Sequence, residues 1–174
     1  IDFGYGKESR THAARLIERL HQEDFRILLH LVQPVKDAWA MSTSFGANAA
    51  RDRWEKFVEE TLSRFEGMIE AVEPAGTVNR FTWSGYTIRG YVIAARIAVD
   101  VCEKHNLPWF GPNVSDFSPT FNIGVLWRLK KRGLSPMAHT DNLFVDRAGQ
   151  PENDDTKVFR RASDHIDFDM VQKA

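Results

Sequence analysis

The sequence predicts a mainly α fold: about five or six helices packed around a central buried helix (about 84–105), with a small C-terminal β-hairpin. Three observations indicate this. The middle of the central segment, Tyr91 to Cys102, is almost wholly apolar, and a helix that is apolar on nearly every side is buried against several partners. A second long segment carries one apolar stripe at helical spacing. The helical periodicity then ends after Gly133.

The composition is that of an ordinary globular chain, and we expect 1–174 to form a single helical domain. Of the 174 residues, 43% are hydrophobic and 27% are charged, and the formal net charge is −1. A net charge so close to zero excludes a general electrostatic attraction to nucleic acid or acidic membranes, so any attraction must come from local asymmetry. The central segment is too short and too charged to span a bilayer, and we expect no membrane partner.

The single cysteine, Cys102, excludes an internal disulfide. This favours a reducing, cytoplasmic compartment, and we expect Cys102 to behave as a small buried hydrophobic residue. The first residue is Ile1 rather than Met, so we expect a processed chain or a fragment of a longer one.

The N-terminal part is expected to begin with an extended arm and to continue with short helices. Residues 1–6 contain two glycines and two aromatic residues, which is typical of such an arm. Apolar residues recur at helical spacing over about 9–20. The apolar run 25–32 is either a new helix or a continuation of the first, and Pro34 opens a short helix over 35–41.

The clearest helical pattern covers 48–72. Its apolar residues form one stripe opposite charged residues, and we expect this stripe to face the core; a groove for a partner helix is the alternative. Pro74 and Gly76 are expected to end the helix, and Ser84 is expected to cap the central helix after a short extended linker. The stripe consists of Trp54, Phe57, Val58, Leu62, Phe65, Met68, Ile69 and Val72.

Charged residues interrupt the apolar central helix. Arg96 and Asp100 stand four residues apart and can form an ion pair along the helix, and Arg89 precedes Arg96 by one heptad. An arginine in so apolar a segment must be paired or must reach the surface. Arg96 is therefore either half of a structural ion pair or an anchor for an anionic ligand.

The last third of the chain changes character. A loop rich in proline, glycine and aromatic residues leads into a basic helix over 119–132. Beyond it, short β-like runs predict a hairpin over 142–162 with an acidic tip. Residues 163–174 alternate between apolar and charged side chains, which predicts a third strand or an arm that docks on another copy. On the basic helix, we expect an inward arc formed by Phe121, Val125, Leu126 and Leu129.

The opposite arc of this helix is cationic and ends in a leucine, basic residues and a glycine, and the predicted hairpin follows it. This arrangement resembles the recognition helix and wing of winged helix-turn-helix proteins. The resemblance implies contacts with phosphates and base edges of a nucleic acid. The alternative is a solvated helix end whose cations suit the helix dipole. The implied nucleic-acid-binding residues are Trp127, Arg128, Lys130, Lys131, Arg132, Arg147, Arg160 and Arg161.

Two patterns that combine histidine with another charged residue would support an enzymatic function. Histidine and aspartate at alternate positions of a strand can bind a divalent metal, and solvated surface residues are the alternative. Arginine followed six or seven residues later by histidine is similar to the Arg–His pair of HEPN-class ribonucleases. The metal candidates are His139, Asp141, His165, Asp167 and Asp169, and the HEPN-like pairs are Arg132 with His139 and Arg15 with His21.

We therefore expect a non-enzymatic binding protein without a cofactor, whose partner is nucleic acid held by the helix 119–132 and the hairpin. The alternative is a helical interaction or assembly module that self-associates through the arms 1–6 and 163–174. A metal-dependent or HEPN-like nuclease comes third. The sequence contains no phosphate-binding loop, dinucleotide-binding glycine motif, zinc-protease motif or serine-hydrolase motif.

Overall fold

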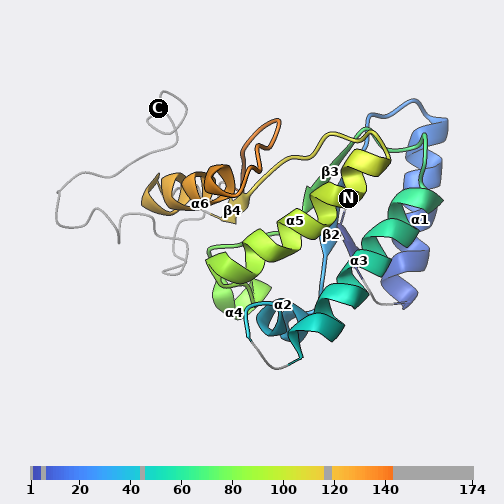
Figure 1. Ribbon diagram of the computed structural model, residues 1–174. Coiled ribbons are helices and arrows are strands. Elements are labelled where there is room, and N and C mark those ends of the chain that lie inside the picture. Colours follow the sequence, from blue (N-terminus) through green and yellow to red (C-terminus); the bar gives the residue numbers. More distant parts are fainter. Residues whose placement is uncertain (1, 5–6, 44–45, 116–118, 143–174) are drawn as a thin grey trace, which may run out of the picture.

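The computed structural model describes residues 2–4, 7–43, 46–115 and 119–142, which form a mainly α-helical fold with a few short strands (Figure 1). The predicted fold class is confirmed. The predicted hairpin beyond Asn142 and the arm 163–174 lie outside the described residues. The helices are α1 (Lys7–Gln22), α2 (Val35–Ala40), α3 (Ala47–Arg64), α4 (Phe81–Ser84), α5 (Ile88–Lys104) and α6 (Pro119–Lys131), and the strands are β1 (Asp2–Gly4), β2 (Leu28–Val32), β3 (Ala71–Pro74), β4 (Asn113–Ser115) and β5 (Thr140–Asn142).

Each pairing between the described strands is parallel, and the strands lie side by side in chain order. β1 pairs with β2, and β2 pairs with β3. Trp109, just before β4, bridges Val72 of β3, and β4 pairs with β5. Parallel neighbours need a crossover connection, which here always contains at least one helix. Sequential parallel strands that alternate with helices are the arrangement of (β/α) barrels, whereas the strand order of doubly wound sheets reverses.

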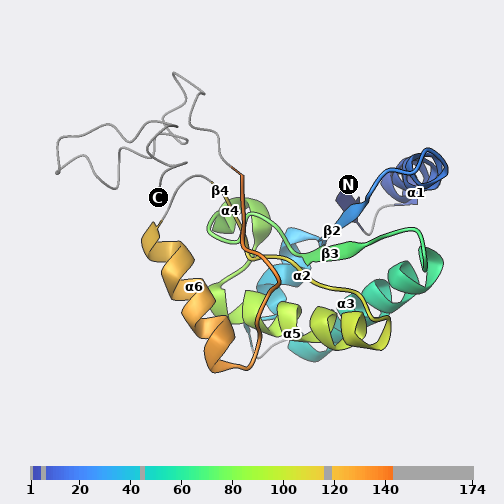
Figure 2. The same cartoon turned by 90° about the horizontal axis from the view of Figure 1, so that it is seen from above.

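The core lies between the strands and the long helices. In Figure 2, α3, α5 and α6 form a row below the strands. Leu29 and Leu31 of β2 are fully buried, whereas His30 between them is only partly covered, because successive strand residues point to opposite faces. Trp54 of α3 is fully buried, and its indole Nε1 donates a 2.9 Å hydrogen bond to the carbonyl of Ala94 in α5. α5 contacts α2, α3, α6 and β3, as expected of the central helix.

Parts of two predicted helical segments are strands in the structure. The apolar run 25–32 contains β2, whose backbone pairs with β1 and β3 on either side. The predicted helix 48–72 ends at Arg64, and Ala71 and Val72 belong to β3. Gly67 has a φ of 75°, a left-handed conformation that glycine adopts without strain and that breaks the helix. Hydrogen bonds to a neighbouring strand outweigh the helical periodicity at both places.

Two further boundaries differ from the prediction. The central helix begins at Ile88 rather than after Ser84, and Thr87 caps it by accepting a 3.0 Å hydrogen bond from the Gly90 amide. Ser84 instead ends the short helix α4, because Gly85 follows with a φ of 75°. The described part of the predicted N-terminal arm, Asp2–Gly4, is extended and forms the edge strand β1.

Candidate functional site

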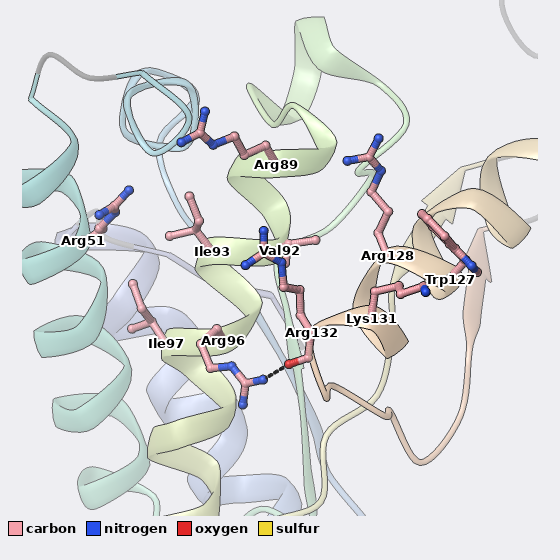
Figure 3. Close-up of a pocket in the computed structure, with 10 residues that line it drawn as sticks. All are labelled: Arg51, Arg89, Val92, Ile93, Arg96, Ile97, Trp127, Arg128, Lys131 and Arg132. Atoms are coloured by element: carbon pink, nitrogen blue, oxygen red, sulfur yellow. Dashed lines mark hydrogen bonds between the residues drawn. The ribbon is translucent and has the colours of Figure 1, made fainter.

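Four of the predicted nucleic-acid-binding residues meet α3 and α5 around one cleft of about 1000 Å³. We call it the basic cleft (Figure 3). Lys130 is exposed on α6 but does not line it. The other three predicted residues, Arg147, Arg160 and Arg161, lie outside the described residues. The basic cleft is lined by Arg51 of α3, by Arg89, Val92, Ile93, Arg96 and Ile97 of α5, by Trp127, Arg128 and Lys131 of α6, and by Arg132.

The lining combines cations with an apolar floor. Six of the ten lining residues are arginine or lysine, and none is acidic. The three aliphatic residues of α5 are half-buried and form the floor, and Trp127 is 57% exposed on the rim. The Lys131 ammonium lies 5.3 Å from the centre of the Trp127 ring, a cation–π contact. The cleft therefore offers both positive charge and an aromatic face.

Arg96 fixes one end of the basic cleft. Its guanidinium lies 3.6 Å from the Asp100 carboxylate, so the predicted ion pair is present. The same group donates a hydrogen bond to the carbonyl of Arg132, just beyond α6 (Figure 3). A carbonyl at a helix end has no partner within its own helix. Arg96 therefore joins α5 to the end of α6.

A second group of polar side chains crosses the strands. His30 of β2, Glu73 of β3, Asn113 of β4 and Asn142 of β5 form what we call the polar row. His30 and Glu73 are register partners, and the imidazole Nδ1 lies 3.8 Å from the carboxylate. The Asn113 amide donates to Glu73 at 3.4 Å, and the Asn142 amide donates to the Asn113 oxygen at 3.0 Å. Four successive strands thus contribute one side chain each.

The two central members of the polar row are buried. Glu73 is 5% exposed and Asn113 is 4% exposed. A buried carboxylate is costly unless hydrogen-bonded, and Asn113 supplies such a bond. The Asn113 oxygen also accepts a 2.9 Å hydrogen bond from the Thr77 backbone amide. Asn113 therefore connects β3, the loop after it and β5.

The loop that follows β3 is strained where it meets the polar row. Ala75 and Thr77 have φ values of 64° and 53°, which are unusual for residues other than glycine. Between them, a Cβ on Gly76 would overlap the imidazole of His30, so only glycine fits without a shift. Backbone strain of this kind clusters at functional sites. The strained loop therefore makes this end of β3 a candidate functional site.

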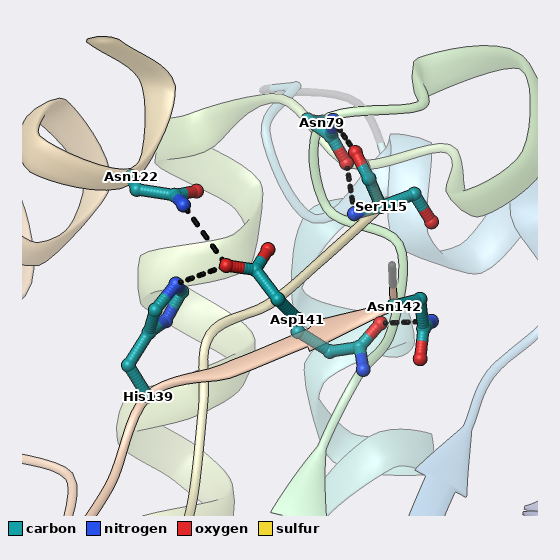
Figure 4. Close-up of polar contacts among 7 residues, drawn as sticks. Asn79, Ser115, Asn122, His139, Asp141 and Asn142 are labelled. Carbon is teal, nitrogen blue, oxygen red and sulfur yellow. Dashed lines mark hydrogen bonds and ion pairs between the residues drawn. The ribbon is translucent and has the colours of Figure 1, made fainter. Parts of the chain in front are cut away.

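Asn79 fastens the same loop to β4. Its amide nitrogen donates to the carbonyl of Ser115 at 2.6 Å, and its oxygen accepts from the Ser115 amide at 2.9 Å (Figure 4). Such a reciprocal pair of hydrogen bonds satisfies both backbone groups of Ser115 at the end of β4.

The predicted metal candidates His139 and Asp141 lie together, but their third neighbour is an amide. His139 Nε2 is 3.2 Å from Asp141 Oδ2, and the same oxygen accepts a 3.2 Å hydrogen bond from Asn122 of α6 (Figure 4). Within residues 2–4, 7–43, 46–115 and 119–142, no group of three or more His, Cys, Asp or Glu side chains could hold a metal. The other candidates, His165, Asp167 and Asp169, are outside this part.

The HEPN-like pairs are not brought to a common site by any described contact. Arg15 and His21 are both exposed on α1. His139 contacts Asp141, and the carbonyl of Arg132 accepts a hydrogen bond from Arg96. A nuclease function therefore stays a prediction.

Burial raises the pKa of two side chains on α5, Cys102 and Tyr91. Cys102 is buried, and loss of solvation raises its pKa to about 12, so the thiol stays neutral as expected of a core residue. Burial also raises the pKa of Tyr91, and the charge of Glu73 adds to the shift. The Tyr91 hydroxyl is therefore protonated.

Sequence reasoning found the α6 side of the basic cleft and missed the polar row. The α6 cations form a local pattern, whereas Arg51 is added by the packing of α3 against α5.

Comparisons with protein-family models, curated proteins and solved structures find no match. No helix in the described part of the chain is long and apolar enough to cross a membrane.

Proposed function

We propose that this is a binding protein whose polar row and the loop after β3 hold a small, uncharged, hydroxyl-rich ligand such as a saccharide. The observation that carries the proposal is the meeting of one polar side chain from each of β2, β3, β4 and β5. Proteins built from parallel strands and helices bind ligands at the carboxyl ends of their strands. Glu73 is next to last in β3 and Asn142 is last in β5, whereas His30 is central in β2 and Asn113 is first in β4.

The chemistry of the polar row favours a neutral ligand. Its groups are two amides, a carboxylate and an imidazole, and the carboxylate repels anions. Amides both donate and accept hydrogen bonds, as a hydroxyl group does. Gln33, directly after β2, is a further buried amide: its oxygen accepts a hydrogen bond from the Tyr86 hydroxyl, and its nitrogen has no hydrogen-bond acceptor in the described region. Buried polar groups without partners are uncommon and call for an explanation, such as a ligand.

Exposed aromatic residues stand at the same end of the strands. The short helices α2 and α4 directly follow β2 and β3 and contact each other. They carry Trp39, Phe81 and Trp83, which are 52%, 48% and 75% exposed. Ligand sites typically combine aromatic walls with a few polar groups. Aromatic faces beside amides and a carboxylate suit a molecule with both C–H and hydroxyl surfaces.

The proposal is tested by ligand-dependent thermal stability of the full chain. We expect a neutral saccharide, from a panel of glucose, mannose, N-acetylglucosamine and their oligomers, to raise the melting temperature by several degrees at about 100 times its Kd. Glucose 6-phosphate, the anionic counterpart of glucose, should not raise the melting temperature. Asn142→Ala should remove the shift, whereas Glu70→Gln, which changes an exposed carboxylate paired with Arg26, should leave it intact. A shift that survives Asn142→Ala would refute the site.

A second candidate is self-association, which the N-terminal arm favours. β1 is the edge strand of the three-stranded sheet, with β2 on one side. An edge strand presents unpaired backbone groups that can pair with another chain. We propose that a dimer would form through β1, and that its mass by light scattering would be twice 19.9 kDa. Deleting residues 1–4 should then give a monomer. We also propose that the protein is located in the cytoplasm, because its single cysteine favours a reducing compartment.

A further inference from the structure

We propose that the basic cleft binds single-stranded nucleic acid, with phosphates along its arginines and a base stacked on Trp127. This inference does not depend on the polar row, which lies on the strands. It keeps the predicted nucleic-acid partner but changes the mode of binding from a recognition helix in a duplex groove to a strand held between helices.

The charge of the basic cleft is local and convergent. The whole chain has a net charge of −1, yet the lining brings six cations from α3, α5 and α6 together without an acidic residue. Figure 3 shows Arg51 and the α6 residues Trp127, Arg128 and Lys131 on opposite sides of α5. Arg96 is partly neutralised by Asp100, whereas within residues 2–4, 7–43, 46–115 and 119–142 the other five have no ion-pair partner and can attract a polyanion.

The unmet hydrogen-bonding capacity of the lining fits the same ligand. Arg51 has a buried Nε without a hydrogen-bond acceptor among the described residues. Arg89 and Arg128 are exposed. Arginine binds phosphate through paired, charge-assisted hydrogen bonds. A phosphate that enters the cleft would supply the acceptors.

The shape of the site favours a single strand over a duplex. A helix that reads a duplex must project into a major groove about 12 Å wide. Here α6 packs against α5, and its Arg128 and Lys131 line a cleft shared with that helix. Proteins that bind single strands combine a cationic groove with aromatic side chains on which bases stack. Trp127 provides such a face, and Val92, Ile93 and Ile97 provide an apolar floor for a second base.

The experiment measures fluorescence anisotropy of a labelled oligothymidylate of about 15 nucleotides with the full chain. Five phosphate contacts on a single strand predict that affinity falls about 100-fold between about 50 and 200 mM salt. Arg89→Glu with Arg128→Glu should abolish binding at low salt. The matched control is Arg19→Glu with Lys36→Glu, which changes the net charge equally at exposed residues of α1 and α2 and should bind within a few-fold of the unchanged protein.

Trp127→Ala separates stacking from charge. Loss of one stacked base should weaken oligothymidylate binding about tenfold, without a change in the salt dependence. A duplex of equal length and heparin are the competing probes, and both should bind at least tenfold more weakly than the single strand. Circular dichroism of each variant verifies the fold.

Several results would overturn the inference. If oligothymidylate does not bind at low salt, the inference is wrong. Equal loss in the Arg19→Glu/Lys36→Glu control would mean that net charge, not the basic cleft, attracts the strand. Heparin or duplex bound as tightly as the single strand, with no effect of Trp127→Ala, would mean a general polyanion surface instead of a single-strand site.

Discussion

The basic cleft and the polar row differ in how they are built. The basic cleft collects long, mostly exposed cations from three helices around half-buried aliphatic residues. The polar row joins short, largely buried side chains from four strands through direct contacts. Exposed cations contribute little to the stability of a fold, whereas buried hydrogen-bonded groups cannot be removed singly without leaving a partner unsatisfied. Substitutions in the basic cleft should therefore weaken binding without a loss of stability, whereas substitutions in the polar row should lower both.

The strongest test of this difference is Asn113→Ala. The substitution leaves the Glu73 carboxylate, the Thr77 amide and the Asn142 amide without their shared partner. Because unsatisfied buried polar groups cost about 1–3 kcal/mol each, we expect the free energy of unfolding to fall by about 3 kcal/mol. Urea unfolding followed by circular dichroism measures it. A loss below about 1 kcal/mol would show that the row is not the structural network described above.

A somewhat smaller effect is expected from Gly76→Ala. The added Cβ would overlap the His30 imidazole, so the loop or the ring must move, at a cost of about 2 kcal/mol. A double-mutant cycle with His30→Ala isolates the cause. If the overlap with His30 is responsible, Gly76→Ala should cost less than about 1 kcal/mol once the ring is absent.

Asn79→Ala should cost about 1–2 kcal/mol, because both backbone groups of Ser115 lose their partner at an end of β4 that is buried. Amide hydrogen exchange offers the more local measurement. The Ser115 amide should exchange faster in the variant, while amides of α3 stay protected. Uniformly faster exchange would instead indicate that Asn79 supports the whole fold.

The smallest effect on stability is expected in the basic cleft. Arg128→Glu replaces an exposed cation and should change the free energy of unfolding by no more than about 0.5 kcal/mol. A loss comparable to that of Asn113→Ala would break the distinction between the two regions and assign Arg128 a structural role.

The same contrast explains what could be predicted from the sequence. The stripe from Trp54 to Leu62 and the arcs of α6 repeat with helical period, so each is visible within a short window. Both are confirmed by burial: Trp54, Val125 and Leu129 are fully covered and Trp127 is exposed. Six described helices agree with the expected number.

Parallel strands of three to five residues carry no comparable signal. Their partners are distant in sequence, and strands covered on both sides read as plain apolar runs. The run 25–32 therefore fits a helix as well as a strand when it is considered alone. The polar row depends on the same pairing, since Glu73 and Asn113 are 40 residues apart. Neither residue stands in a motif that would single it out.

The order of the strands has a consequence for how the chain acquires its structure. Each new strand is laid beside the segment that precedes it in the chain, so its pairing partner has already been synthesised. A nascent chain can thus assemble progressively as it leaves the ribosome, each unit meeting a partner that is already in place.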